Sequence, residues 1–210
     1  MPPTVDALLP LSFLEAVRAV DRPDEDPDAE FVAELRNKRL GLSDTVHAQI
    51  RRYAEAARRR QRQTADEVAA LARLIGRRPD AEAVFRAAGA LLGERAYAAL
   101  PGATRQMVHA LPAPAARPLA LRQLRRLTRR YLGGTVRREG AAVVLEVPAP
   151  LDDAAGAAGA YYAAVFGAFL RHLMPDGAAD AAPRVEPLPA GDGGAGSARW
   201  RAAWGASVRQ

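Results

Sequence analysis

The feature that most constrains how this chain can fold is a charge-free run in its last third. No Asp, Glu, Lys or Arg occurs between residues 154 and 170. Large side chains recur at helical spacing, since positions i, i+4, i+7 and i+11 are Tyr162, Phe166, Phe169 and Leu173. The adjoining face is apolar too. The run therefore predicts a helix that other elements surround on nearly all sides.

A β-hairpin is predicted directly after this helix. Its two strands, residues 184–188 and 198–204, are joined by a glycine-rich connection. Trp200 and Trp204 fall on one face of the second strand, with arginines alternating on the other, which is the period-two pattern of a half-buried strand. Pro187 lacks the N–H that a central strand would donate, so we expect the first strand at a sheet edge.

A second hairpin precedes the apolar helix. Residues 135–138 and 142–147 read as two strands that are joined at Glu139-Gly140. Helices are expected before it over residues 81–100, 104–111 and 119–131. Residues 112–118 contain three prolines and read as a connector between the last two helices. Two hairpins that share one sheet, with the helices gathered on one face, make an α+β domain.

Residues 1–78 are expected to form a helical extension of that domain, which itself spans residues 79–210. Four helices are predicted in the extension, over residues 10–20, 28–40, 43–61 and 64–76. Ser43 or Asp44 would cap the third, and Thr64 and Glu67 have the spacing of a capping box for the fourth. The predicted fold class is thus α+β, with an N-terminal helical extension followed by a four-stranded antiparallel sheet (two β-hairpins) packed on helices.

Composition narrows the class of protein. The 210 residues include no cysteine, which removes disulfides, thiolate metal sites and cysteine nucleophiles and fits a reducing cytoplasm. No apolar run reaches the ~18 residues of a membrane span. Residues 1–14 lack the basic start of a signal peptide. We therefore expect a cytoplasmic protein.

The sequence offers little for catalysis or for binding a cofactor. It contains no Gly-x-Ser-x-Gly elbow and no recognisable triad. The three histidines, His47, His109 and His172, do not stand at a metal-ligand spacing. One of the last two could serve as an axial haem ligand, but a structural or exposed histidine is the interpretation we favour. We expect no enzyme, no metal and no cofactor.

Arginine dominates the net charge of +6, because Lys38 is the only lysine. Such a bias is typical of a GC-rich genome. Arginines cover one face of the predicted helices over residues 43–61 and 119–131. These faces could follow nucleic-acid phosphates, or meet an anionic membrane surface or an acidic protein. No aromatic residues interleave with the arginines, and we favour solvated helix faces.

Several segments resemble one protein superfamily. They are Ala81–Gly89 (AEAVFRAAG), Leu119–Gly133 (LALRQLRRLTRRYLG), the Tyr161-Tyr162 pair and the ending RVEPLPAGDGGAGSARWRAAWG. With the order of elements, they make residues 79–205 similar to the superfamily that joins the 4-vinyl-reductase-type small-ligand domain, the TRAPP transport-particle subunits and the haem nitric-oxide-binding domains. Many bacterial members carry a cysteine pair in the last hairpin. This chain has none, so a metal or redox role through such cysteines is unsupported.

The resemblance implies a fold that often encloses an apolar cavity for a lipid or another small hydrophobic ligand, or that serves as an assembly subunit. The candidate walls of that cavity are Phe85, Leu92, Tyr161, Tyr162, Phe166, Phe169 and Trp200. Gly167, inside the apolar helix, costs about 1 kcal/mol relative to alanine. Either close packing, which we favour, or space for a ligand would offset that cost.

The predicted function is therefore a non-enzymatic module of bacterial type that binds a small hydrophobic ligand, or that acts in sensing or assembly. Its expected partners are a small hydrophobic molecule, another protein or a second copy of the chain. The alternative is binding of nucleic acid or an anionic surface through the arginine-rich faces.

Overall fold

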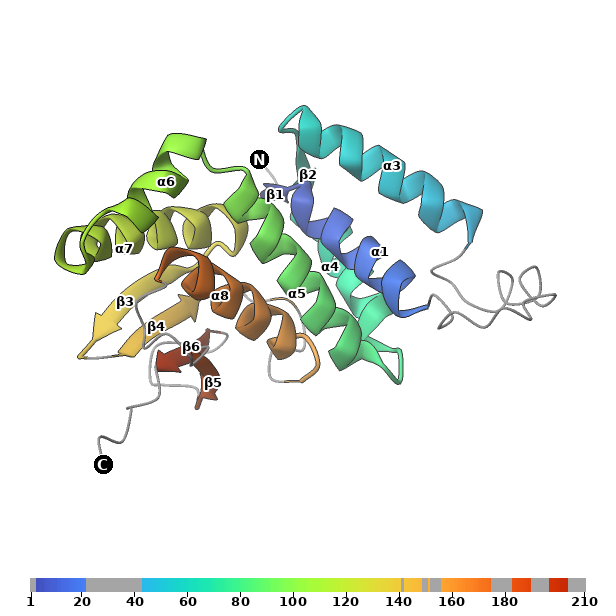
Figure 1. The fold of residues 1–210 in the computed structure, drawn as a ribbon. Coiled ribbons are helices and arrows are strands. Elements are labelled where there is room, and N and C mark those ends of the chain that lie inside the picture. Colours follow the sequence, from blue (N-terminus) through green and yellow to red (C-terminus); the bar gives the residue numbers. More distant parts are fainter. Residues whose placement is uncertain are drawn as a thin grey trace, which may run out of the picture.

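The computed structural model describes residues 3–21, 43–140, 142–148, 151, 156–174, 183–189 and 197–203. In these residues the helices are α1 (Leu8–Val20), α3 (Asp44–Arg58), α4 (Ala65–Gly76), α5 (Ala81–Ala98), α6 (Gly102–Ala110), α7 (Ala113–Tyr131) and α8 (Gly159–Leu173). The strands are β1 (Thr4–Asp6), β2 (Arg62–Thr64), β3 (Thr135–Glu139), β4 (Ala142–Val147), β5 (Arg184–Leu188) and β6 (Ala198–Ala203). Figure 1 shows their arrangement. The predicted helix over residues 28–40, the glycine-rich connection at 191–196 and Trp204 lie outside the described residues.

The four C-terminal strands form one antiparallel sheet in the order β3-β4-β6-β5. Both predicted hairpins are present, and they join through β4 and β6. Leu145 is the register partner of Trp200, and Val143 is the partner of Ala202. All four side chains are buried, so one sheet face is apolar as the alternation predicts. Pro187 lies in the edge strand β5, which confirms its expected position.

Two helices, α7 and α8, cover the apolar face of this sheet, and α5 packs along α8 (Figure 1). The aromatic face of α8 is buried as predicted, including Tyr162, Phe166 and Phe169. Tyr162 stacks on Trp200 of β6, with ring centroids 4.8 Å apart. A mixed α+β chain that contains a four-stranded antiparallel sheet is thereby confirmed.

The N-terminal helices share the core of the rest of the molecule, because α1 packs against α5. Phe13 of α1 is fully buried. Its ring lies 5.6 Å from Phe85 and 5.2 Å from Tyr161, in edge-to-face geometry. Such aromatic pairs add about 0.5–1.5 kcal/mol beyond the burial of their surface. A continuous core therefore crosses residue 78, and the division of the chain into an extension of residues 1–78 and a domain of residues 79–210 remains a prediction.

The N-termini of α3 and α4 differ in how they are capped. Ser43 caps α3 as predicted, since its hydroxyl accepts the N–H of Val46 at 3.3 Å. The predicted capping box of α4 is wrong: among the described residues, the Thr64 side chain accepts no capping hydrogen bond. Its expected partner Glu67 instead accepts a hydrogen bond of 2.6 Å from the Tyr53 hydroxyl. Burial, together with this bond, raises the pKa of Tyr53 to about 12.

The short sheet formed by β1 and β2 was not predicted. The two strands have three residues each and pair antiparallel, with Thr4 opposite Thr64 and Asp6 opposite Arg62. Three residues are too few to display an alternating pattern. The pairing ties the N-terminus to the segment between α3 and α4.

The predicted proline-rich connector at residues 112–118 is also wrong, because these residues begin α7. The carbonyl oxygen of Pro112 accepts the N–H groups of Ala115 and Ala116, both at 2.9 Å. Prolines in a first helical turn cost little, since the N–H groups they lack have no intrahelical partner there. Pro118 falls in the second turn and removes a single bond of the ladder. None of the helices in the described part of the chain combines the length and apolar character needed to cross a bilayer.

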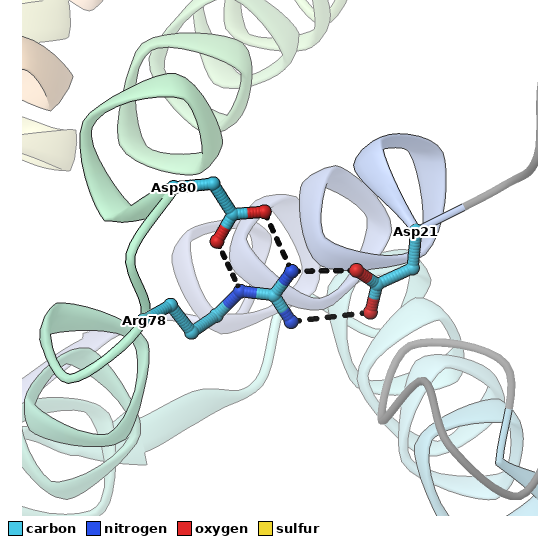
Figure 2. Close-up of polar contacts among 3 residues, drawn as sticks. All are labelled: Asp21, Arg78 and Asp80. Atoms are coloured by element: carbon cyan, nitrogen blue, oxygen red, sulfur yellow. Dashed lines mark hydrogen bonds and ion pairs between the residues drawn. The ribbon is translucent and has the colours of Figure 1, made fainter.

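Arg78, in the turn between α4 and α5, links this turn to the C-terminal end of α1 (Figure 2). The Arg78 guanidinium donates to the Asp21 carboxylate at 2.5 and 3.1 Å and to the Asp80 carboxylate at 2.7 and 2.8 Å. Both contacts are bidentate, which is the strongest geometry for such pairs. The hydrogen bonds from Arg78 lower the pKa of Asp80. Asp21 is buried, so the bidentate contact with Arg78 offsets part of the cost of removing its carboxylate from water.

We expect Arg78→Leu to lower the free energy of unfolding by about 2 kcal/mol, because it leaves the buried Asp21 carboxylate without its guanidinium partner. A depressed pKa of Asp80 stabilises the fold above the ordinary aspartate pKa of about 4, and this contribution disappears as the pH falls below it. In urea titrations, the difference between variant and wild type should therefore be full at about pH 6 and should shrink only as the pH falls below about 4. Arg77→Leu, at the exposed neighbouring arginine, is the control. Equal effects of the two substitutions would contradict the prediction.

Candidate functional site

An open groove of about 860 Å³ runs along α8 in the described part of the chain. Its floor is the one face of α8 that carries small side chains, at Ala160, Ala163, Ala164 and Gly167. These four residues are only partly buried. The prediction that α8 is covered on nearly all sides is therefore wrong for this face, because α5 and β5 border the face and leave it partly exposed.

Three other elements form the walls of the groove. Val185 and Pro187 come from the edge strand β5, and Trp200 comes from β6. On the opposite side stand Glu82, Arg86 and Ala90 of α5. These wall residues come from separate parts of the chain, and they lie around one groove because α5 and β5 flank α8 on opposite sides. The result is an apolar trough with charged side chains on one rim.

Charge in the groove comes from two arginines and one glutamate. Arg86 forms an ion pair with Glu82 one helical turn earlier in α5. Arg171 lies in the last turn of α8, is exposed, and has no ion-pair partner among the described residues. An apolar trough that ends at an unpaired guanidinium suits a molecule with an apolar body and an anionic group.

The seven predicted wall residues do not gather around this groove. Trp200 alone lines it, and its side chain is almost wholly covered. The other six are packed in the core: Phe85, Leu92, Tyr161, Tyr162, Phe166 and Phe169. Helical periodicity identifies buried side chains correctly, but it cannot separate a core from a cavity wall. Contact of these six residues with a ligand remains a prediction.

Gly167 lines the groove and does not lie at the tight contact between α5 and α8. A Cβ atom at Gly167 would lie 3.6 Å from Val185 Cγ2, which is an ordinary contact. Close helix approach occurs instead at Gly89 and Gly93 of α5. A Cβ at Gly89 would lie 2.5 Å from the carbonyl oxygen of Tyr161, and one at Gly93 would collide with Ala168. Sequence reasoning missed this role, although two glycines four residues apart are a known signal of close helix packing.

Two adjacent tyrosines at the start of α8 differ in their hydrogen bonding. The Tyr162 hydroxyl accepts the N–H of Leu151 at 2.7 Å. The Tyr161 hydroxyl is fully buried and has no hydrogen-bond partner within the part of the chain that the structure describes. Burial raises the pKa of Tyr162 to about 12 and that of Tyr161 well above its ordinary value.

We expect Tyr161→Phe to raise the free energy of unfolding by up to about 1 kcal/mol, because it removes a buried hydroxyl that lacks a partner. Tyr162→Phe should lower it by about 1 kcal/mol, because the Leu151 N–H then loses its acceptor. The two variants differ by the same single oxygen atom and can be compared in urea titrations. A loss in Tyr161→Phe as large as that in Tyr162→Phe would contradict the prediction.

The two histidines considered as haem ligands lie together, away from the groove. A hydrogen bond of 2.8 Å joins His109 Nε2 to the Tyr97 hydroxyl. The His172 ring stacks on Tyr97 at 4.4 Å, and its Nε2 lies 2.9 Å from Glu94 Oε1. These contacts tie α5, α6 and α8 together. Over the residues that the structure describes, no three His, Asp or Glu side chains converge in a way that could hold a metal ion.

Comparison with known protein families, with curated proteins and with solved structures finds no match for this chain. The resemblance of residues 79–205 to the 4-vinyl-reductase, TRAPP and haem nitric-oxide-binding superfamily therefore stays a prediction. The groove, with its residues and charges, is the feature on which a function can be argued.

Proposed function

We propose that this protein is a non-enzymatic binding module whose groove along α8 takes a small, mainly hydrophobic molecule. The observation that carries the proposal is the groove itself. Its volume of about 860 Å³ lies within the range of roughly 300–1,000 Å³ that is usual for small-molecule sites. Its floor consists of Ala and Gly side chains, which let a ligand approach the helix closely.

The chemistry of the rim narrows the class of ligand. An apolar body would lie along Ala160, Ala163 and Gly167 and reach Trp200 at the sheet side. Burying each methylene group of such a body is worth about 0.8 kcal/mol. A carboxylate or a similar anionic group would find Arg171, which is exposed and has no ion-pair partner among the described residues. A medium-chain carboxylate is therefore the probe of choice, with the uncharged alcohol of equal length beside it.

Native mass spectrometry of the purified protein, followed by thermal-shift titration with both probes, tests the proposal. We expect saturable stabilisation by the carboxylate and weaker stabilisation by the alcohol, since a ligand that binds only the folded state raises the melting temperature. A mass equal to the bare chain together with no shift from either probe would overturn it.

A groove-filling substitution localises the site. Ala163→Leu puts a larger side chain on the groove floor, where we expect it to abolish the thermal shift by both probes. Ala19→Leu is the matched control, because Ala19 is an exposed alanine on α1 and lies outside the groove. Equal ligand-induced shifts in the two variants would place any binding elsewhere on the molecule.

A further inference from the structure

The exposed side of α7 carries a strong positive charge and takes no part in the groove. This helix holds six arginines and no Asp or Glu. Arg122, Arg126 and Arg129 fall at i, i+4 and i+7, so they share one face. All three are exposed and have no ion-pair partner among the described residues. A solvated helix face normally carries both positive and negative side chains, which limits repulsion between like charges. The exposed face of α7 carries only positive ones.

The fold extends this surface onto a second arginine-rich segment. Arg130 of α7 reaches Asp6 of β1, with its Nη2 atom 2.9 Å from the carboxylate. In the short sheet, Asp6 is the register partner of Arg62 on β2. Arg62 in turn donates to the Thr4 hydroxyl at 2.8 Å. Arg62 of β2 thus lies across the short sheet from the residue that Arg130 of α7 contacts, so the basic side of α7 extends toward β2.

We propose that this basic surface, defined by Arg122, Arg126, Arg129, Arg130 and Arg62, binds the phosphate backbone of a double-stranded nucleic acid. Charge complementarity selects a polyanion, because only one acidic side chain, Asp6, contacts these five arginines among the described residues. Planar guanidinium groups match phosphate oxygens in a bidentate way. The row presents no base-reading element, so recognition would be independent of sequence.

Two other polyanionic partners fit less well. A single strand would need exposed aromatic rings on which its bases stack, and the aromatic residue of α7, Tyr131, is buried. An amphipathic helix that lies in a membrane must expose its apolar face to lipid. The apolar side of α7 is instead buried in the core through Leu124 and Leu127.

The test measures binding of the full chain to a fluorescent DNA duplex of about 20 base pairs, by anisotropy, between about 50 and 200 mM salt. We expect affinity to fall steeply with salt, and Arg122→Gln/Arg126→Gln/Arg129→Gln to reduce the log–log slope by roughly 2–3. The control Arg51→Gln/Arg77→Gln/Arg184→Gln removes the same charge from exposed positions elsewhere. It should lower the slope by less than roughly 1.

Three outcomes would overturn the proposal. They are no duplex binding by the wild-type chain at the lowest salt, equal losses in the two triple variants, and retention only on vesicles that contain anionic lipid. Circular dichroism of each variant shows whether the fold is intact. A single-stranded oligonucleotide of the same length should bind more weakly than the duplex, and tighter binding of the single strand would also contradict the assignment.

Discussion

Gly89→Ala is expected to lower the free energy of unfolding by about 2–3 kcal/mol, although alanine is the better helix former. The added Cβ would lie 2.5 Å from the Tyr161 carbonyl oxygen and 2.8 Å from Ala164 Cβ. The first is a backbone atom and the second is the Cβ of an alanine, so a change of rotamer cannot relieve the overlap. Overpacking of this kind typically costs about 1–3 kcal/mol and sometimes more, which exceeds the roughly 1 kcal/mol gained in helix propensity.

Gly167→Ala is the matched control, because it makes the same chemical change inside the other helix of the pair. Its Cβ would meet only Val185 Cγ2, at 3.6 Å. We therefore expect unchanged or greater stability, by up to about 1 kcal/mol. Urea titration followed by circular dichroism gives both values. Similar effects of the two substitutions would show that α5 and α8 are farther apart than the structure places them.

Gly89→Ala also tests whether the packing of α5 against α8 shapes the proposed binding groove. Glu82, Arg86 and Ala90 of α5 form one wall of the groove. If Gly89→Ala pushes α5 away from α8, the wall moves and the affinity for the proposed ligand should fall. Gly167→Ala, on the groove floor, should reduce affinity by steric contact without loss of stability. The two variants therefore separate an effect on the wall from an effect on the floor.

Phe13→Ala is expected to cost about 3–5 kcal/mol, the usual range for removing a fully buried phenyl ring. Phe13 contacts Phe85 of α5 and Tyr161 of α8. Because these residues belong to the same core as Trp200, the variant should lose stability as a whole and unfold in one transition. Tryptophan fluorescence includes the signal of Trp200 and so reports on the sheet, and far-ultraviolet circular dichroism reports on the helices. The midpoints of both signals should shift by the same amount.

The alternative outcome is equally informative. If residues 1–78 unfold as an independent domain, Phe13→Ala will shift the circular dichroism and leave the tryptophan transition at its wild-type midpoint. Val20→Ala, at a partly exposed position on the same helix, controls for weakening of α1 alone. Its effect should be below about 1 kcal/mol on both signals.

Much of the local structure could be predicted from the sequence, because it depends on neighbours along the chain. The spacing of Tyr162, Phe166 and Phe169 identifies a buried helical face, and the alternation around Trp200 identifies a strand. Pro187 indicates an edge strand because the missing N–H is a property of proline itself. Prediction was wrong at Pro112–Pro118 and at the capping box of Thr64, where a local signal was compatible with two arrangements.

Only the tertiary structure decided where the hollow lies. Side chains such as Phe85 and Leu92 have the composition of a cavity wall, yet packing from α1 and the sheet fills the space around them. The groove arises on the small-residue face of α8, which the described elements cover only in part. The proposed basic surface likewise depends on the pairing of β1 with β2, which places Arg62 opposite Asp6, the residue that Arg130 of α7 contacts. Sequence periodicity determines which faces are apolar, whereas contacts between distant segments determine which of those faces remain open.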